Sequence, residues 1–344
     1  MHICNDPDFS NLLAVLRHEA PSRPTLFEFF LNGPLYFKLA GMEEQPCPGL
    51  DGDRVAMKAY LRAGYDYVTI QASGMCFPTK PADHLASRSM DGQAVIFDRK
   101  SYEAYQWPDP DSFDYSKLDT LGAELPEGMK FIVWGPGGVL ENVMSLVGYE
   151  GLCLMMADDP ELVEKIFEDV GSRFVRYYEI SSPHPAVGAV ISNDDWGFNT
   201  QTMLAPEDMR KYVFPWHERI TSVIHAAGKP AILHSCGKLD LVMDDIIDGM
   251  GYDGKHSYED NICPVEDAYE KYGKRIAILG GLDLDFVCRS TPEQISARAQ
   301  AMLDRSATRG SYALGSGNSI PHYVPDENYL AMIAPAVAGR VRAV

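Results

Sequence analysis

Short apolar segments alternate with longer amphipathic segments along nearly the whole chain, and this alternation constrains the fold more than any other feature of the sequence. Eight segments have the apolar, β-branched or aromatic composition of buried strands, and they cover residues 25–30, 65–70, 130–134, 186–192, 231–233, 254–257, 275–279 and 311–314. Continuous apolar strands that alternate with helices are typical of a parallel sheet covered by helices. The count of eight therefore predicts an α/β fold of the (β/α)8 TIM-barrel type.

Helical periodicity, with helix start and stop residues, fills the intervals between these strands. It predicts helices over residues 9–19, 54–63, 160–180, 206–227, 239–248, 292–309 and 325–341. Residues 78–125 interrupt the alternation because they are richer in proline, aspartate and serine. We interpret them as an excursion from a single TIM-barrel domain that spans residues 1–344, either a lid or a surface insertion.

Charge and cysteine usage restrict the surroundings of the protein. The chain has 49 acidic and 30 basic residues and a net charge of −19, whereas binding to nucleic acid or to anionic membranes requires basic clusters. The seven cysteines are scattered and odd in number, which favours a reducing compartment without disulfides. The sequence has no signal-peptide pattern and no apolar run of membrane-spanning length. We therefore expect a cytoplasmic protein that binds neither nucleic acid nor a membrane.

A histidine and a cysteine follow the apolar run 231–233. Because side chains alternate across a strand, His234 and Cys236 point the same way, and a neutral imidazole with a thiolate can hold one zinc ion. A buried histidine beside a reduced cysteine is the alternative without a metal. His256, at the end of the next strand, is the best candidate for a third ligand. Three protein ligands would leave zinc the open position of a catalytic site.

Polar residues also end most of the other predicted strands, where the active site of a TIM barrel lies. Glu28 interrupts an apolar strand, and a buried carboxylate requires either a partner or a function. We expect catalytic roles for Glu28, Glu141, Asp194 and Asp195. The last three are also competing oxygen donors for the metal, and the two aspartates have an alternative role as caps of helices or turns. We expect substrate-binding roles for Asn193, Trp196, Ser316 and Asn318.

Several longer segments in the second half of the chain form a recognisable set. They are Gly251-Tyr252-Asp253, Tyr272-Gly273-Lys274, Leu279-Gly280-Gly281-Leu282-Asp283, Thr291-Pro292-Glu293-Gln294-Ile295, Gly315-Ser316-Gly317-Asn318-Ser319-Ile320-Pro321 and Val324-Pro325-Asp326-Glu327-Asn328. With these segments the chain resembles the uroporphyrinogen decarboxylase superfamily, and the resemblance in strand order extends over nearly the full length. The resemblance implies a (β/α)8 barrel, in agreement with the strand count.

Two branches of this superfamily differ at the strand ends. The decarboxylases have an arginine-rich stretch after the first strand and an aspartate at the end of the second, whereas this chain reads Glu28-Phe29-Phe30-Leu31-Asn32-Gly33 and Gln71-Ala72-Ser73-Gly74-Met75. A porphyrinogen with many carboxylates would meet the wrong charge at Glu28. The methyltransferase branch has His-x-Cys at the end of strand five, which His234-Ser235-Cys236 matches.

The resemblance to the methyltransferase branch implies a zinc ion that holds an acceptor thiol as thiolate, or activates a methyl donor, and a corrinoid carried by a partner protein. One feature departs from that branch: its third ligand is a cysteine near the end of strand eight, where this chain has Ser316, Asn318 and Ser319. We predict a zinc-dependent methyltransferase that moves a methyl group between a small molecule and a corrinoid protein. A decarboxylase of a smaller carboxylic acid and a non-catalytic partner of a corrinoid protein are the alternatives.

Overall fold

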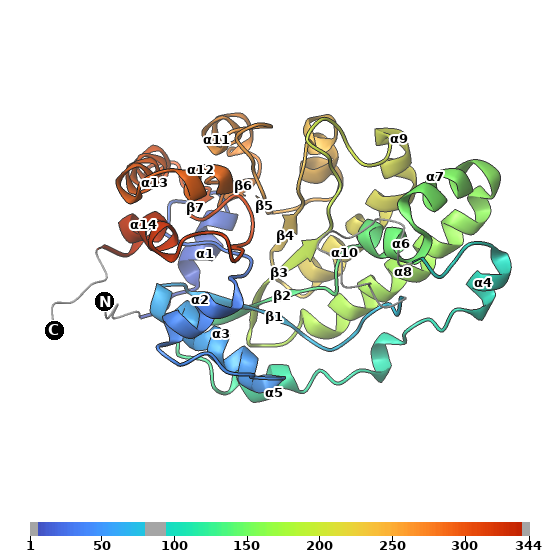
Figure 1. The fold of residues 1–344 in the computed structure, drawn as a ribbon, viewed down its shortest axis with the longest axis horizontal. Coiled ribbons are helices and arrows are strands. Elements are labelled where there is room, and N and C mark those ends of the chain that lie inside the picture. Colours follow the sequence, from blue (N-terminus) through green and yellow to red (C-terminus); the bar gives the residue numbers. More distant parts are fainter. Residues whose placement is uncertain (1–5, 80–93, 339–344) are drawn as a thin grey trace.

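A curved sheet of seven parallel strands lies at the centre of the molecule, with helices packed around it (Figure 1). The structure is a computed structural model that describes residues 6–79 and 94–338. The strands are β1 (Tyr67–Gln71), β2 (Lys130–Trp134), β3 (Val187–Asn193), β4 (Ala231–His234), β5 (Gly254–His256), β6 (Ala277–Leu279) and β7 (Tyr312–Ala313). They are hydrogen-bonded in chain order. All carboxyl ends of the strands therefore lie at one edge of the sheet.

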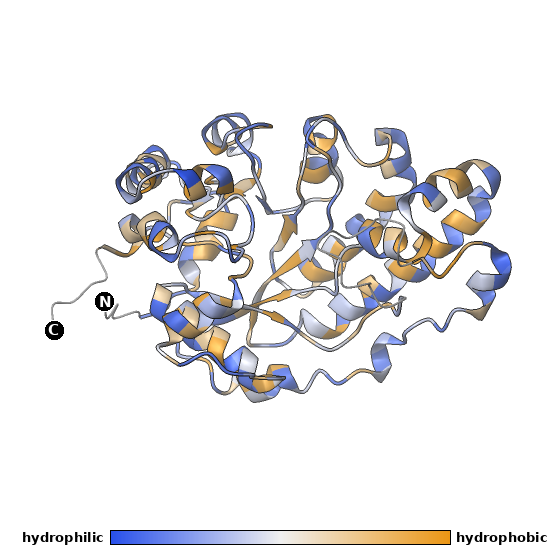
Figure 2. Ribbon diagram, viewed as in Figure 1, coloured by the Kyte–Doolittle hydropathy of each residue, from blue (hydrophilic) through white to orange (hydrophobic). Residues whose placement is uncertain are grey.

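Helices connect successive strands and cover the outside of the sheet. They are α1 (Ser10–Leu16), α2 (Gly33–Ala40), α3 (Leu50–Ala63), α4 (Arg99–Ala104), α5 (Lys117–Gly122), α6 (Val139–Val147), α7 (Tyr149–Asp158), α8 (Pro160–Ser181), α9 (Pro206–Asp208), α10 (Phe214–Ala226), α11 (Val265–Tyr272), α12 (Leu284–Arg289), α13 (Pro292–Ser306) and α14 (Asp326–Val337). Figure 2 shows apolar strands and helices that are apolar on one face. This distribution is what burial of both faces of a parallel sheet requires.

Seven of the eight predicted strands are confirmed. The predicted first strand, residues 25–30, forms one isolated parallel bridge at Leu26, and a second follows at Leu31, instead of a continuous ladder. On the side of β7, the backbone N–H of Phe27 donates to the carbonyl of Leu314 at 2.8 Å. On the side of β1, the carbonyl of Phe29 accepts from the Thr69 hydroxyl at 2.7 Å. Hydroxyl groups of side chains thus take the place of the backbone donors that a full strand pairing would use.

The predicted helix over residues 206–227 is present but divided. A π-helical turn, Met209–Val213, separates α9 from α10. Pro215 near the start of α10 lacks the N–H that would bond to the carbonyl four residues earlier, which explains the wider turn. The predicted helix over residues 239–248 is likewise a 3-10 turn, Asp240–Val242, followed by a π turn, Asp245–Gly249. The prediction for residues 325–341 is confirmed by α14 up to Val337, and residues 339–344 lie outside the described part.

The described part of the excursion at residues 78–125 contains α4, the 3-10 turn Pro110–Ser112 and α5. It lies along α8, where Arg176 pairs with Asp111 at 2.6 Å and Arg173 donates to the carbonyl of Pro108 at 2.8 Å. Residues 80–93 lie outside the described part.

Among the described helices none is by itself long and apolar enough to cross a membrane, although α6 and α7 together, bent by 88°, meet both criteria.

Candidate metal centre

The register of the sheet brings three predicted site residues side by side. Asn193 on β3 is paired with His234 on β4, and His234 is paired with His256 on β5. Residues in register on parallel strands project to the same face, so the three polar side chains share one face at the carboxyl edge. The Oδ1 atom of Asn193 is buried and has no hydrogen-bond partner among the described residues.

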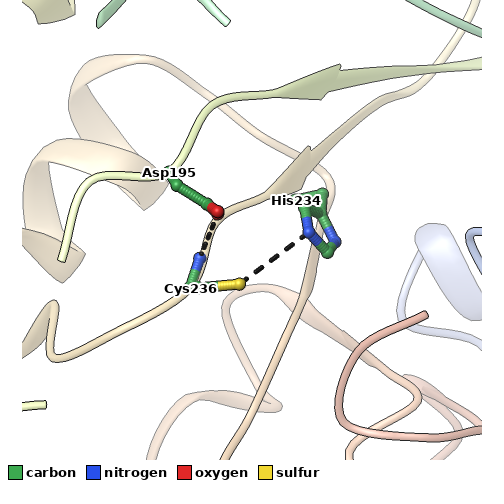
Figure 3. A group of neighbouring side chains, drawn as sticks. All are labelled: Asp195, His234 and Cys236. Carbon is green, nitrogen blue, oxygen red and sulfur yellow. Dashed lines mark hydrogen bonds between the residues drawn. The ribbon is translucent and has the colours of Figure 1, made fainter. Parts of the chain in front are cut away.

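Asp195, His234 and Cys236 each offer one possible metal-ligand atom and lie side by side, with the Cys236 sulfur facing the His234 ring and the Asp195 carboxylate facing the backbone nitrogen of Cys236 (Figure 3). These atoms all lie within 4.8 Å of one another, and Sγ of Cys236 lies 3.9 Å from Nε2 of His234. Zn–S and Zn–N bonds are about 2.3 Å and 2.05 Å long, so one zinc ion can touch both atoms across that gap. The carboxylate is held in place because the backbone N–H of Cys236 donates to Oδ1 of Asp195 at 2.9 Å. A set of one nitrogen, one sulfur and one oxygen donor suits zinc.

Burial sets the protonation states of the His234 ring and the Cys236 thiol. It lowers the pKa of His234 to about 3, so the ring is the neutral imidazole that metals bind. Burial, with the charge of Asp195, raises the pKa of the Cys236 thiol to about 12. The thiol therefore keeps its proton until a cation binds, and binding of a metal should release that proton.

Two further side chains donate to the sulfur of Cys236. The amide of Asn318 lies 3.1 Å from Sγ, and the hydroxyl of Ser257 lies 3.3 Å from it. Donors of this kind orient and tune a metal-bound thiolate. Asn318 was predicted to bind substrate, and the structure places it at the sulfur.

Ser257 and Lys255 lie at the site although neither was predicted from the sequence. Ser257 has φ +85°, a strained backbone conformation for a residue with a side chain, and only the structure reveals it. Lys255 is buried in β5, and its ammonium donates to the carbonyls of Ser257 at 2.7 Å and Ser235 at 3.2 Å. Burial lowers the pKa of Lys255 to about 8. A lysine within the buried strand 254–257 was the signal that could have drawn attention to it.

Asp194 is occupied by structural contacts. Its carboxylate accepts from the backbone N–H groups of Leu140 at 2.9 Å and Glu141 at 3.0 Å, at the start of α6. Its Oδ2 also lies 3.0 Å from Nε2 of His217, and both side chains are fully buried. These contacts satisfy N–H groups that a helix start leaves without partners. The alternative role as a cap therefore describes Asp194, and its predicted catalytic role has no support from the geometry.

Glu141 follows in the first turn of α6. Its Oε2 accepts from the backbone N–H of Gly138 at 2.8 Å. Burial, with the charges of Asp194 and Asp195, raises the pKa of Glu141 to about 8. A carboxyl of this pKa is largely protonated at neutral pH and can donate a proton, as its predicted catalytic role requires.

Glu28 is fully buried and holds the turn after β7. Its Oε1 accepts from the backbone N–H of Ser316 at 2.6 Å, and its Oε2 lies 2.8 Å from the Ser316 hydroxyl. The hydroxyl donates to Glu28, and it also contacts the carbonyl oxygen of Asn318. Burial raises the pKa of Glu28 to about 8, in keeping with a neutral acid. Both predicted site residues, Glu28 and Ser316, thus form a clamp inside the protein.

His256 and Trp196 lie elsewhere than the sequence analysis expected. Nδ1 of His256 faces Nδ1 of His234 at 2.8 Å, and its Nε2 faces the carbonyl of Ser316 at 3.2 Å. Neither nitrogen faces Cys236, so Asp195 takes the place expected for His256 in the group of ligand atoms. Trp196 is fully buried, and its ring packs edge-on against His217 with centroids 4.8 Å apart. This burial leaves no part of the ring for a substrate.

A groove of about 750 Å³ opens beside the candidate metal centre. Gly317 and Asn318 line it together with Tyr258, Asp283 and Phe286. Because the amide of Asn318 also contacts Cys236, the groove reaches within one residue of the sulfur. A small molecule in it would lie next to the candidate ligands.

Comparison with known proteins gives a family and a fold. The family model of uroporphyrinogen decarboxylase (URO-D) matches residues 95–337. A methyltransferase from Methanosarcina mazei is similar over 96% of this chain and 98% of its own, with a TM-score of 0.67 and 16% sequence identity. Xylanase B from Clostridium stercorarium F9 covers 66% of this chain and 85% of its own, with a TM-score of 0.40 and 12% identity. No curated protein sequence matches the chain. At such low identity the methyltransferase shows a common fold.

Proposed function

The chain belongs to the uroporphyrinogen decarboxylase family, and from this premise we propose that it is a zinc-dependent methyltransferase that moves a methyl group between a small molecule and a corrinoid protein. The observation that carries the proposal is the group of Asp195, His234 and Cys236, whose ligand atoms lie within 4.8 Å of one another. The corrinoid protein as partner rests on the resemblance of His234-Ser235-Cys236 to the methyltransferase branch. We also propose that residues 25–31 count as the eighth strand, so that the chain is one (β/α)8 barrel domain.

The three proposed ligands leave a fourth position open, as catalytic zinc sites do. Bound zinc would lower the pKa of a coordinated thiol and hold it as a nucleophilic thiolate, or polarise a methyl donor. Other residues of the chain orient the sulfur, donate a proton and bind the substrate. Asn318 and Ser257 orient the Cys236 sulfur by their hydrogen bonds. The protonated carboxyl of Glu141 supplies a proton donor at neutral pH, and the amide oxygen of Asn193, which has no partner in the described part of the chain, binds substrate.

Aromatic side chains form one side of the proposed site. The ring of Phe29 lies 4.8 Å from that of His234 and 5.4 Å from that of Trp134, and Phe30 is 41% exposed. An aromatic surface favours an apolar or methylated group over a carboxylate. This stretch follows Glu28, where porphyrinogen decarboxylases carry arginines, so we do not expect this chain to decarboxylate porphyrinogens.

The test uses methylcobalamin as methyl donor and a panel of small thiols as acceptors, with loss of the methyl group followed by visible absorption. We expect turnover by the zinc-loaded protein, loss of turnover on removal of zinc by a chelator, and recovery when zinc is returned. Cys236→Ser should lose at least about 100-fold, because a hydroxyl is a poor zinc ligand.

The matched control is Cys153→Ser, since Cys153 is exposed on α7 and should tolerate the change. Equal turnover by Cys236→Ser and Cys153→Ser, or full turnover by protein stripped of zinc, would remove the metal centre from the reaction.

A further inference from the structure

Two buried histidines share a hydrogen bond next to the proposed metal site. Nδ1 of His234 and Nδ1 of His256 are 2.8 Å apart, and the ring centroids are 4.9 Å apart. His234 is 7% exposed and His256 is fully buried. Two neutral imidazoles can form this bond only if one Nδ1 carries a hydrogen and the other does not. The direction of the bond therefore decides the tautomer of both rings.

The second nitrogen of His256 fixes that direction. Its Nε2 lies 3.2 Å from the carbonyl oxygen of Ser316, and a carbonyl can only accept a hydrogen bond. Nε2 of His256 therefore carries the hydrogen, and its Nδ1 is the acceptor. The hydrogen on the His234 ring must then sit on Nδ1. This leaves a lone pair on Nε2 of His234, which is the atom 3.9 Å from the Cys236 sulfur.

Ser316, whose carbonyl accepts the hydrogen bond from His256, is itself held in place by buried contacts. The backbone N–H of Ser316 donates to Glu28 at 2.6 Å, and the Ser316 hydroxyl contacts the second oxygen of Glu28 at 2.8 Å. The ring of Phe27 packs against that of His256 with centroids 5.1 Å apart. The position of the Ser316 carbonyl, and with it the His256 ring, is therefore fixed by buried contacts on more than one side.

We propose that His256 is a positioning residue, which fixes the tautomer and the orientation of His234 so that the Nε2 lone pair faces the metal position, and is not itself a ligand. The inference rests on the proposed zinc site, which it deepens. It also explains why two histidines at neighbouring strand ends do not both turn to the metal. Partners of this kind, beyond the ligands, typically change metal affinity by about 10–100-fold.

The experiment compares His256→Leu with His256→Asn. Leucine fills a similar volume but cannot accept a hydrogen bond, whereas the Oδ1 of asparagine can occupy the place of Nδ1 and accept from His234. Zinc affinity is measured by competition with a chromophoric chelator, and the ligand set by the absorption spectrum of the cobalt-substituted protein. We expect about 10–100-fold weaker zinc binding in His256→Leu, recovery of most of it in His256→Asn, and an unchanged sulfur-to-cobalt charge-transfer band and coordination number at saturating cobalt in both.

Two results would overturn the proposal. Loss of a nitrogen ligand in His256→Leu would make His256 a ligand, and unchanged affinity would deny it any role at the metal. Circular dichroism and thermal melting confirm that both variants fold.

A readout without metal separates this inference from the proposed function. In the metal-free wild type, nitrogen NMR of labelled histidine should show the hydrogen of His234 on Nδ1. In His256→Leu this hydrogen should no longer be confined to Nδ1. A wild type that binds no zinc would end the proposed function. A His234 ring with its hydrogen on Nε2 would end the inference about His256 whatever the metal result.

Discussion

Two neighbouring aspartates at the end of β3 lie in regions of opposite character. The first region consists of Asp194, His217, Tyr252 and the start of α6, and its polar atoms are paired: Asp194 meets His217, whose Nδ1 lies 2.7 Å from the Tyr252 hydroxyl. The second region consists of Asp195, His234 and Cys236, whose ligand atoms all lie within 4.8 Å of one another. A buried acid whose carboxylate accepts from several backbone and side-chain groups maintains the fold, whereas three ligand atoms of different elements that lie close together can bind one cation.

The largest expected effect separates these two acids. Asp194→Ala should lower the free energy of unfolding by about 3–5 kcal/mol, because it leaves Nε2 of His217 and two backbone N–H groups of α6 buried without the partner they have now. Asp195→Ala should cost less than about 1 kcal/mol, since the half-buried side chain accepts from one N–H group. It should however weaken zinc binding. Urea denaturation and zinc titration of both variants provide the measurement, and equal stability of the two would remove the distinction between the regions.

The next prediction concerns Glu28, which, like Asp194, lies in a region whose polar atoms are paired. Burial raises its pKa from 4.5 to about 8, so between these values Glu28 is protonated in the folded protein and ionised in the unfolded chain. Its contribution to stability is then complete below pH 4.5 and is lost as pH rises towards 8. Glu28→Gln cannot ionise, so its stability relative to the wild type should increase across this window by a few kcal/mol, at about 1.4 kcal/mol per pH unit.

Denaturant unfolding of the wild type and Glu28→Gln at several pH values measures this difference. A difference that is constant between pH 5 and 8 would contradict the assignment of Glu28 as a neutral acid in the clamp.

A smaller effect concerns the backbone that carries Cys236. Gly237 has φ +87°, and a Cβ added there would lie 2.2 Å from the carbonyl carbon of Gly197. Gly237→Ala should therefore lower stability by about 2 kcal/mol and weaken zinc binding by displacing Cys236. Gly74→Ala is the matched control, because its Cβ meets no atom within 4 Å, and its stability should change by less than about 0.5 kcal/mol. Wild-type zinc affinity in Gly237→Ala would contradict this prediction, because it would mean that the backbone at Cys236 can shift without loss of the metal.

Much of the sheet could be predicted from the sequence because its strands are apolar on both faces. The exception, residues 25–31, lies where the hydroxyls of Tyr60 and Thr69 satisfy the carbonyl of Phe29. Those two residues come from α3 and β1, and no local pattern shows that they will meet this carbonyl. The divided helix at Pro215 could have been expected, since proline cannot complete the helical hydrogen bond at that position.

The candidate site was only partly predictable. His234 and Cys236 share a direction because they are two residues apart at a strand end, which the sequence shows directly. The different roles of Asp194 and Asp195 depend on where α6 begins, more than 50 residues away. The role of His256 depends on the Ser316 carbonyl, which is 60 residues away in sequence. Contacts over such distances decide which polar group is already paired.

The central claim is that Asp195, His234 and Cys236 bind one zinc ion, and zinc X-ray absorption of the metal-loaded protein tests it most directly. We expect one zinc per chain with one sulfur neighbour at about 2.3 Å and nitrogen or oxygen neighbours at about 2.0–2.2 Å, and loss of the sulfur neighbour in Cys236→Ser. A wild-type protein that takes up no zinc, or a zinc ion without a sulfur neighbour, would contradict it.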